Sequence, residues 1–347
     1  MLYEREGHHE QAGLRHTTGR RLWNLLPGKA MYNPLPIFRF IQSEHAAGRA
    51  AALVTIIAVT GSSARSCGTH MAVSENGCFA GSLTGGCIEA AVVAEAQEAL
   101  IQKAPRTIRY GAGSPFIDIR LPCGGSVVLV INPLIDSLLG EQALVLFEER
   151  QSFTLTLGGD AQSITPADHD LFACKATTDA LVVHHIPPLQ LALFGHAAAM
   201  PIVRDLALAC GAHVVLASPD PDLVRESMQK GCSSVSMVQA ATAPLIRPDL
   251  WTAGVVLFHD HDWEPATLRH LLASKAFFIG AMGSHKTQRE RLAVLARQGV
   301  TVADQSRVIG PIGAIPSMRD PETLAVSVFA QVVDAYNKRF LNGGHLA

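Results

Sequence analysis

The 347-residue sequence lacks a long hydrophobic run, an excess of charge of either sign, and closely paired cysteines. Its longest apolar stretch, residues 50–59, is interrupted by Thr55 and falls far short of the roughly 20 residues that a membrane-spanning helix needs. Nucleic-acid binding requires a concentrated basic surface, and the formal net charge of −2 gives no support for one. We therefore expect neither a membrane span nor a nucleic-acid partner.

The cysteines are odd in number and none forms a Cys-x-x-Cys pair; the seven lie at positions 67, 78, 87, 123, 174, 210 and 232. This spacing argues against both a disulfide framework and a structural zinc ribbon, and it is typical of a reducing compartment. We therefore expect a cytoplasmic protein. Residues 1–30 are polar and irregular, with no apolar stretch of signal-peptide length, so we interpret them as a disordered extension.

The hydrophobic content of 48% is sufficient for an ordered, globular chain. The length of 347 residues predicts about two domains. The stiff Pro187-Pro188 pair marks the predicted boundary. Residues 31–187 mix helical and strand patterns, with helices expected at 34–47, 88–100 and 142–150 and strands at 51–60, 71–73, 78–80, 107–110, 126–132, 153–157 and 180–183. Residues 188–340 instead alternate regularly, with strands at 191–194, 214–217, 255–258 and 277–279 and helices near 201–210, 223–230, 265–274 and 287–298.

Regular alternation of strand and helix indicates parallel βαβ units. The predicted fold class is therefore α/β, with an N-terminal α+β domain followed by a Rossmann-like, doubly wound parallel sheet. In a dinucleotide-binding Rossmann domain, the first strand should end in G-x-G-x-x-G and an acidic residue should follow about 20 positions later. Here residues 195–200 keep only Gly195, and the second strand ends at Ser218. The sequence thus argues against NAD or FAD bound in the usual pose.

Three glycine-rich corners interrupt the first domain, and two of them carry a cysteine; they contain Gly61, Ser62 and Arg65, then Gly85, Gly86 and Cys87, and finally Cys123, Gly124 and Gly125. Glycine lets the backbone approach a ligand where a Cβ would collide. The second corner leads into the helix predicted at 88–100, whose free N–H groups would attract an anion and favour a thiolate. Glu89 at this helix start is a candidate ligand or proton carrier, or else a residue that complements the helix dipole.

A further candidate anion site lies in the second domain, where Gly283 and Ser284 precede a helix carrying Lys286, Arg289 and Arg291. Cations at a helix N-terminus are costly unless an anion offsets them, although a solvated basic face is an equal alternative. Residues 259–262, His-Asp-His-Asp, resemble a metal site in composition. Alternate residues on an extended chain point in opposite directions, so we favour an ordinary loop there.

The corners and loops described above resemble, in the same order, those of the XdhC/CoxI family, accessory proteins that mature molybdenum hydroxylases. The resemblance extends from about residue 34 to 338, through residues 61–71, 81–89, 123–125, the Rossmann entry, 259–260, 280–284, 311–313 and 320–327. The chain departs from the family pattern at Ala198, where a histidine is usual, and at Ile315 and Ser317, which replace an acidic residue and a glycine. These departures argue further against NAD or FAD and indicate a branch specialised for one client.

The resemblance implies a chaperone and not an enzyme. Such a protein binds the molybdenum cofactor, as molybdopterin or its dinucleotide form, assists its sulfuration with a cysteine desulfurase, and inserts it into an apo molybdenum hydroxylase of the xanthine dehydrogenase or aldehyde oxidoreductase type. We expect a homodimer that uses the cleft between its two domains. The predicted cofactor-binding residues are Gly61, Ser62, Arg65, Gly85, Gly86, Cys87, Glu89, Cys123, Gly124, Gly125, Gly195, Gly283, Ser284 and Arg289.

Cys87 and Cys123 are the candidate contacts to molybdenum, because thiolates suit a soft metal. Free cysteines are also commonly small buried hydrophobes, which is the alternative for both. Two other functions stay open at this point. One is an NAD(P)- or flavin-dependent oxidoreductase, which a flavin spectrum after purification would favour; the other is a scaffold that joins a cysteine desulfurase to the apoenzyme without holding cofactor.

Overall fold

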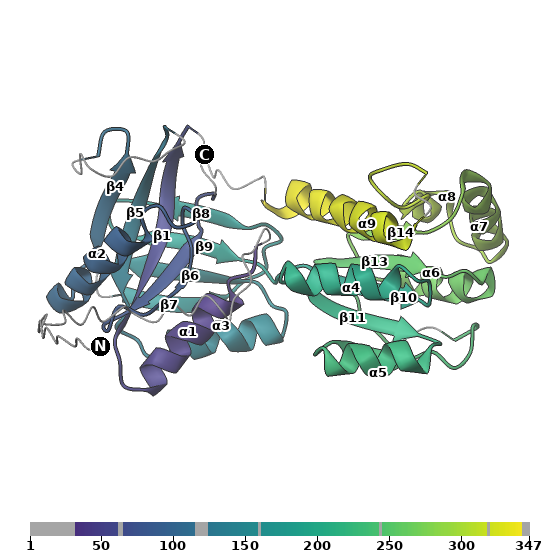
Figure 1. Cartoon of the computed structure of the whole chain (residues 1–347), viewed down its shortest axis with the longest axis horizontal. Coiled ribbons are helices and arrows are strands. Elements are labelled where there is room, and N and C mark those ends of the chain that lie inside the picture. Colours follow the sequence, from purple (N-terminus) through teal and green to yellow (C-terminus); the bar gives the residue numbers. More distant parts are fainter. Residues whose placement is uncertain are drawn as a thin grey trace, which may run out of the picture.

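The computed structural model describes residues 32–61, 65–114, 124–158, 161–242, 245–317 and 320–341. Within these ranges the strands form a five-stranded sheet, a four-stranded sheet and a six-stranded sheet (Figure 1). The six-stranded sheet is parallel and follows the α+β part of the chain, which confirms the predicted fold class.

The five-stranded sheet has the order β3-β2-β1-β5-β4, and its neighbouring strands are antiparallel. Its elements are α1 (Leu35–Ala46), β1 (Ala51–Thr60), β2 (His70–Ser74), β3 (Phe79–Gly81), α2 (Glu89–Gln102), β4 (Arg106–Gly111), β5 (Ser126–Pro133) and α3 (Leu139–Glu148). Ala52, Val54 and Ile56 of β1 belong to the hydrophobic core on the α2 side, whereas Leu53 packs into the core that contains α1. Both faces of the first half of β1 are therefore buried, as its continuous apolar run predicts.

The four-stranded sheet, β7-β6-β9-β8, is antiparallel. Its strands are β6 (Phe153–Gly158), β7 (Ala161–Pro166), β8 (Ala173–Ala176) and β9 (Leu181–His185). The sequence predicts β6 and β9 but not β7 or β8. β7 is largely exposed and lacks an apolar face, which leaves little signal for a strand.

The parallel sheet has the order β12-β11-β10-β13-β14-β15, which is the 3-2-1-4-5-6 order of Rossmann folds. Its elements are β10 (Gln190–Gly195), α4 (Met200–Ala209), β11 (His213–Ser218), α5 (Pro221–Gln229), β12 (Ser233–Ser236), β13 (Thr252–Leu257), the short helix η2 (His261–Trp263), α6 (Glu264–Leu272), β14 (Phe278–Ala281), α7 (His285–Arg297), α8 (Val302–Gln305), β15 (Val308–Ile309), α9 (Pro321–Tyr336) and η3 (Asn337–Leu341). β10 is buried along its whole length, as expected of the first strand of such a sheet.

The two parts of the chain meet at the amino ends of the Rossmann strands. The Asn33 side chain donates a hydrogen bond to the carbonyl oxygen of Gly211, two residues before β11, at 2.6 Å. The Arg150 guanidinium donates to the carbonyl oxygen of Pro188 at 3.1 Å and pairs with Asp249, which precedes β13. One hydrophobic cluster also runs through both parts. The division into residues 31–187 and 188–340 therefore stays a prediction.

A buried pair of histidines joins the first two sheets. His70 of β2 and His185 of β9 face each other, with their Nε2 atoms 3.3 Å apart. The Nδ1 atom of His70 lies 2.8 Å from the Thr55 hydroxyl, and the Nδ1 atom of His185 lies 2.6 Å from the Tyr32 hydroxyl. Burial lowers the pKa of His70 to about 3, and burial together with His70 lowers the pKa of His185 well below its usual value. Both rings are therefore neutral in the folded protein.

This pair predicts that the protein loses stability in acid. Below pH 6.5 the unfolded chain protonates both histidines while the folded chain does not, so the free energy of unfolding falls as the pH drops from about 6.5 toward 3. Each histidine contributes a slope of about 1.4 kcal/mol per pH unit in that window. Urea unfolding measured between pH 7 and pH 4.5 should show a shallower pH dependence for His70→Gln than for wild type. Substitution of the half-buried His45 by Gln is the control and should leave the slope unchanged.

Candidate functional site

Three loops open from the same end of the five-stranded sheet. Because the neighbouring strands are antiparallel, β1, β3 and β4 end where β2 and β5 begin. The loop after β1, the loop after β3 and the loop between β4 and β5 therefore leave the sheet together. These loops, at residues 61–69, 82–88 and 112–125, contain the three glycine corners, and we call them the glycine end. The fold thus brings together corners that are far apart in the sequence.

Glu89 organises the second of these loops, residues 82–88, through its own hydrogen bonds. Its side chain is 4% exposed and accepts five hydrogen bonds. The donors are the Ser82 and Thr84 hydroxyls and the backbone N–H groups of Leu83, Thr84 and Ile88, at distances between 2.8 and 3.2 Å. The carboxylate therefore serves as an internal template around which the loop folds back onto the start of α2.

The same contacts keep Glu89 ionised. Burial opposes the charged form, but the hydrogen bonds from Thr84, Ser82 and the loop backbone outweigh it and lower the pKa of Glu89 to about 2. A carboxylate with this pKa holds no proton near neutral pH. Glu89 lies in the first turn of α2, where its charge complements the helix dipole, and its hydrogen bonds are to its own loop and not to a cargo.

The tip of this loop faces outward. Gly85 and Gly86 have φ values of 84° and 117°, a backbone region that glycine adopts without strain, and a Cβ at either position would meet no atom within 4 Å. Cys87 follows them directly and is exposed. The tip therefore presents backbone and a thiol to open space, immediately before the start of α2.

The first and third glycine corners contact each other. Gly61 has a φ of 75°, and a Cβ on it would lie 3.2 Å from the Cα of Gly125, so the close approach of β1 and β5 requires glycine there. Gly124 has a φ of 70° with open space beside it, and Arg65 is half-buried. Two of the predicted site residues, Ser62 and Cys123, lie outside the described residues.

Cys67, at the glycine end, differs from Cys87 in its surroundings. Burial raises the pKa of the Cys67 thiol, and burial together with Cys67 raises the pKa of Cys174 on β8 to about 12. Gly68 packs against the same strand, where a Cβ would lie 3.1 Å from the Cβ of Cys174. Cys67 and Cys174 are therefore packed as neutral thiols, which leaves Cys87 as the exposed thiol among the described part of this end.

The loop that follows β10, at Gly195 to Ala197, packs against the neighbouring strand of its own sheet. A Cβ on Gly195 would lie 2.1 Å from the carbonyl oxygen of Leu257, so this glycine is required by packing against the end of β13. The N–H groups of His196 and Ala197 both donate to that same oxygen, at 3.2 and 3.1 Å. These two donors therefore serve the fold and are not free for a pyrophosphate.

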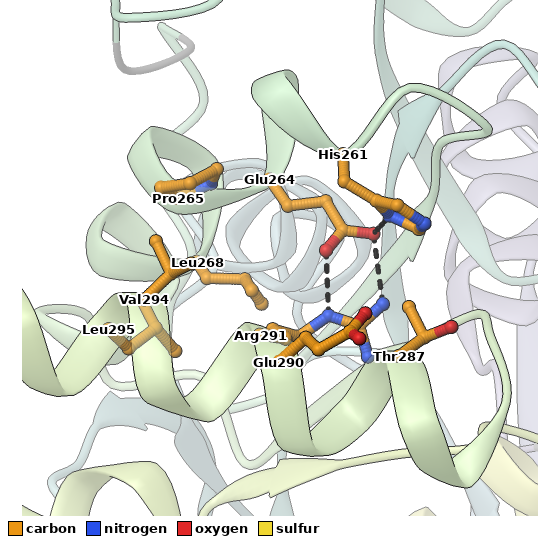
Figure 2. Close-up of a pocket in the computed structure, with 9 residues that line it drawn as sticks. All are labelled: His261, Glu264, Pro265, Leu268, Thr287, Glu290, Arg291, Val294 and Leu295. Carbon is orange, nitrogen blue, oxygen red and sulfur yellow. Dashed lines mark hydrogen bonds and ion pairs between the residues drawn. The ribbon is translucent and has the colours of Figure 1, made fainter.

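The basic loop before α7 contains an internal ion pair (Figure 2). Arg291 pairs with Glu264 of α6 at 2.7 Å, and the two side chains are 2% and 3% exposed. A Cβ on Gly283 would lie 2.9 Å from a methyl carbon of Thr287, so packing explains this glycine, and the Ser284 hydroxyl accepts from the N–H of Thr287 at the helix start. Arg291 is therefore neutralised internally, whereas Lys286 and Arg289 in the first turns of α7 are exposed.

The described residues contain neither a cluster of metal-ligating side chains nor a membrane-spanning helix. No cluster of three or more His, Cys, Asp or Glu side chains there could hold a metal ion, which includes the residues around His259. Within the same residues, no helix is long and apolar enough to cross a bilayer.

The glycine end and the carboxyl edge of the Rossmann sheet belong to different parts of the fold. Ligands of open α/β sheets bind beyond the carboxyl ends of the strands. Here the amino ends of those strands contact the first part of the chain, at Gly211 and Pro188, and β11 points away from it (Figure 1). The cleft expected between the two domains therefore does not bring both predicted regions together within one chain.

These features define a Rossmann-containing protein whose glycine and cysteine loops are carried on a separate antiparallel sheet. Residues 45–111 match the family described as XdhC and CoxI, and residues 191–332 match the XdhC Rossmann domain. The chain is also 31% identical over 305 residues to the molybdenum cofactor insertion chaperone PaoD of Escherichia coli strain K12, covering 85% of this chain and 86% of that protein. The chain therefore belongs to the XdhC/CoxI family, as its motifs predict.

A solved structure shares the fold. The crystal structure of a xanthine dehydrogenase from Bacillus halodurans superposes with a TM-score of 0.67, covering 88% of this chain and 96% of that one. At 20% identity this similarity concerns the fold alone.

Proposed function

We propose that this protein is a molybdenum cofactor chaperone that holds its cargo at the glycine end and passes it to an apo molybdenum hydroxylase. The observation that carries the proposal is the presence of three glycine corners at one end of the five-stranded sheet, one of which carries the exposed thiol of Cys87. The relative PaoD, a molybdenum cofactor insertion chaperone by name, supports the same function. A maturation factor of this kind binds and transfers its cargo without catalysing metabolite turnover.

The residues of the glycine end fit such a cargo in three respects. Gly85, Gly86 and Gly124 leave open space in which an anionic pterin phosphate could approach the backbone. Cys87 offers sulfur to a soft metal centre. Glu89 turns its charge inward onto five donors, so it holds the loop without facing an anionic cargo.

Retention of the cofactor on gel filtration tests this function. We expect the wild type to retain molybdenum cofactor and Cys87→Ser to retain it about tenfold more weakly, because a neutral hydroxyl replaces the sulfur ligand. Cys123→Ser should weaken retention in the same way if the third corner contributes a thiol. Cys210→Ser, a half-buried cysteine at the end of α4, is the matched control and should behave as wild type. Absence of retention by the wild type would overturn the proposal.

The proposal extends to the partners of the cargo. A cysteine desulfurase would supply sulfur for sulfuration at the glycine end, and the recipient would be a hydroxylase of the xanthine dehydrogenase or aldehyde oxidoreductase type. We place these events in the cytoplasm, where free cysteines persist. A homodimer belongs to the same proposal, because a second copy could bring a Rossmann crevice to the glycine end, which the fold of one chain does not do. Light scattering of the purified protein measures its mass.

A further inference from the structure

The outermost strand of the four-stranded sheet has an open edge. Among the described residues β7 pairs with β6 alone, and it lies at the lower edge of that sheet in Figure 1. The N–H group of Ala167, directly after β7, donates to the carbonyl oxygen of Ser152 at 2.9 Å. Bonded and non-bonded pairs alternate along an antiparallel ladder, so Ser163 also turns its backbone groups toward β6. The backbone N–H and C=O groups of Gln162 and Ile164 therefore point away from the sheet, and no described residue bonds to them.

The proline at the end of β7 agrees with this orientation. Proline has no N–H group to donate, and within sheets it is confined to positions such as edge strands where the missing donor faces outward. Pro166 lies opposite Phe153, at a position where β7 and β6 are not hydrogen-bonded. The outward donors of β7 are therefore the N–H groups of Gln162 and Ile164.

The edge of β7 lacks the charges that protect exposed edges from pairing. Soluble proteins commonly place charged side chains on such strands, because unpaired N–H and C=O groups are a template for another strand. β4, a six-residue edge strand of the first sheet, carries Arg106 and Arg109. β7 has the same length, is largely exposed, and carries no charged residue along its sequence Ala-Gln-Ser-Ile-Thr-Pro. This difference indicates that the edge of β7 is kept for pairing.

Exposed apolar side chains lie beside this edge. Ile135 is 65% exposed, and its N–H group donates to the Gln162 side chain of β7 at 2.9 Å. Leu138, at the start of α3, and Val145, within it, are 54% and 45% exposed, and α3 packs against β7. A strand that paired with β7 would bring a second protein surface next to these side chains. The open edge and the apolar side chains thus indicate the same interface.

We propose that β7 pairs with β7 of a second copy of this chain, so that two four-stranded sheets join into one antiparallel sheet. An antiparallel pair about a two-fold axis is self-complementary, because the same strand supplies both sides. A strand without charge meets no like charge in its own copy, which favours a second copy of this chain as the occupant.

Pro166 selects the register of this pairing. If Ile164 lay opposite the partner's Ile164, the carbonyl oxygen of Gln162 would face the partner's Pro166 and find no donor. With Ser163 on the two-fold axis, Gln162 instead lies opposite the partner's Ile164. Every outward N–H and C=O group of these two residues then has a partner.

Cysteine cross-linking of the full-length protein tests this register. The Cα atoms of a non-bonded antiparallel pair lie about 4.5 Å apart, within the range that a disulfide spans. We expect Ser163→Cys to form a disulfide-linked dimer with oxidised glutathione, seen by non-reducing gel electrophoresis. Thr165→Cys, exposed on the same strand, is the matched control. It lies opposite the partner's Ala161 and about 13 Å along the strand from its own copy, so it should cross-link no more than wild type.

Light scattering tests the same surface without cross-linking. We expect the mass of a dimer for wild type and that of a monomer for Ser163→Lys, in which two lysines would face each other on the axis. Thr165→Lys would face the partner's Ala161 and should stay dimeric. Ser163 is exposed, so its substitution leaves the fold of the single chain intact, which circular dichroism checks.

The inference rests on the homodimer of the proposed function and names its surface. A wild-type dimer that Ser163→Lys does not dissociate and Ser163→Cys does not cross-link would overturn this surface and leave the homodimer in place. A monomeric wild type would overturn both. Cofactor retention is measured separately, and the glycine end belongs to a different sheet from β7, so neither result decides the chaperone function.

Discussion

Replacing Glu89 by alanine is expected to weaken cofactor retention more than tenfold in a protein that still folds. The substitution leaves three backbone N–H groups and two hydroxyls of the loop without their acceptor. Unsatisfied buried donors of this kind cost about 2–4 kcal/mol in total once the loop relaxes. We therefore expect the free energy of unfolding to fall by that amount and cofactor retention to fall more than tenfold, measured by urea unfolding and by gel filtration with cofactor.

Two further variants show whether the effect of Glu89→Ala comes from the lost hydrogen-bond acceptors of the loop. Glu89→Gln keeps one acceptor oxygen and should lose less stability and less retention than Glu89→Ala. Glu98→Ala, a half-buried glutamate further along α2, is the control for helix α2 itself and should retain cofactor normally. If Glu89→Ala unfolded like wild type and still retained cofactor, the loop would not depend on this carboxylate and the candidate site would lose its organising residue.

Breaking the buried ion pair between Glu264 and Arg291 is expected to destabilise the Rossmann part strongly. Arg291 also donates to the Gln288 side chain at 2.6 Å and to the carbonyl oxygen of Met282, so it cannot move to water without losing them. Glu264→Ala leaves this cation buried without its counter-charge, which costs about 3–5 kcal/mol. Urea unfolding followed by tryptophan fluorescence reports the loss directly, because Trp263 adjoins the pair and stacks on Phe258.

A double variant tests whether the uncompensated buried charge causes the loss of stability. Replacing both partners by apolar residues, Glu264→Leu with Arg291→Met, removes the uncompensated charge and should be less destabilising than Glu264→Ala. Lys286→Met breaks the exposed pair with Glu290 on the same helix and should leave the unfolding midpoint unchanged. A Glu264→Ala midpoint equal to that of wild type would contradict the role given to this pair.

The sequence predicts the Rossmann sheet well because its signal is local. Each buried strand of that sheet is an apolar run followed by a helical pattern, and the strand order follows from the fold class. The family membership is predicted for a similar reason, since its motifs are short and keep their order. The sequence predicts four of the six Rossmann strands and lacks β12 and β15, as it lacks β7 and β8, because these strands are short or exposed and carry no apolar pattern.

The candidate site is less predictable because its contacts are long-range. Arg291 belongs to a basic cluster in the sequence, yet its charge is cancelled by Glu264, which lies on another helix. Glu89 carries a carboxylate that could bind a ligand, but the hydrogen bonds that it accepts come from the loop that folds over it. Local spacing indicates which residues have useful chemistry and does not indicate which way they face.

The sequence alone determined the fold class, the family and the positions at which glycine is needed, because strand periodicity, helix periodicity and backbone freedom are properties of short segments. Only the tertiary structure decided that three glycine corners share one end of a sheet, that Glu89 turns inward, and that the Rossmann crevice faces away from the first part of the chain. Those outcomes depend on strand pairing and on the contacts at Gly211 and Pro188. Pairing of this kind joins segments far apart in the chain, and no short pattern specifies it.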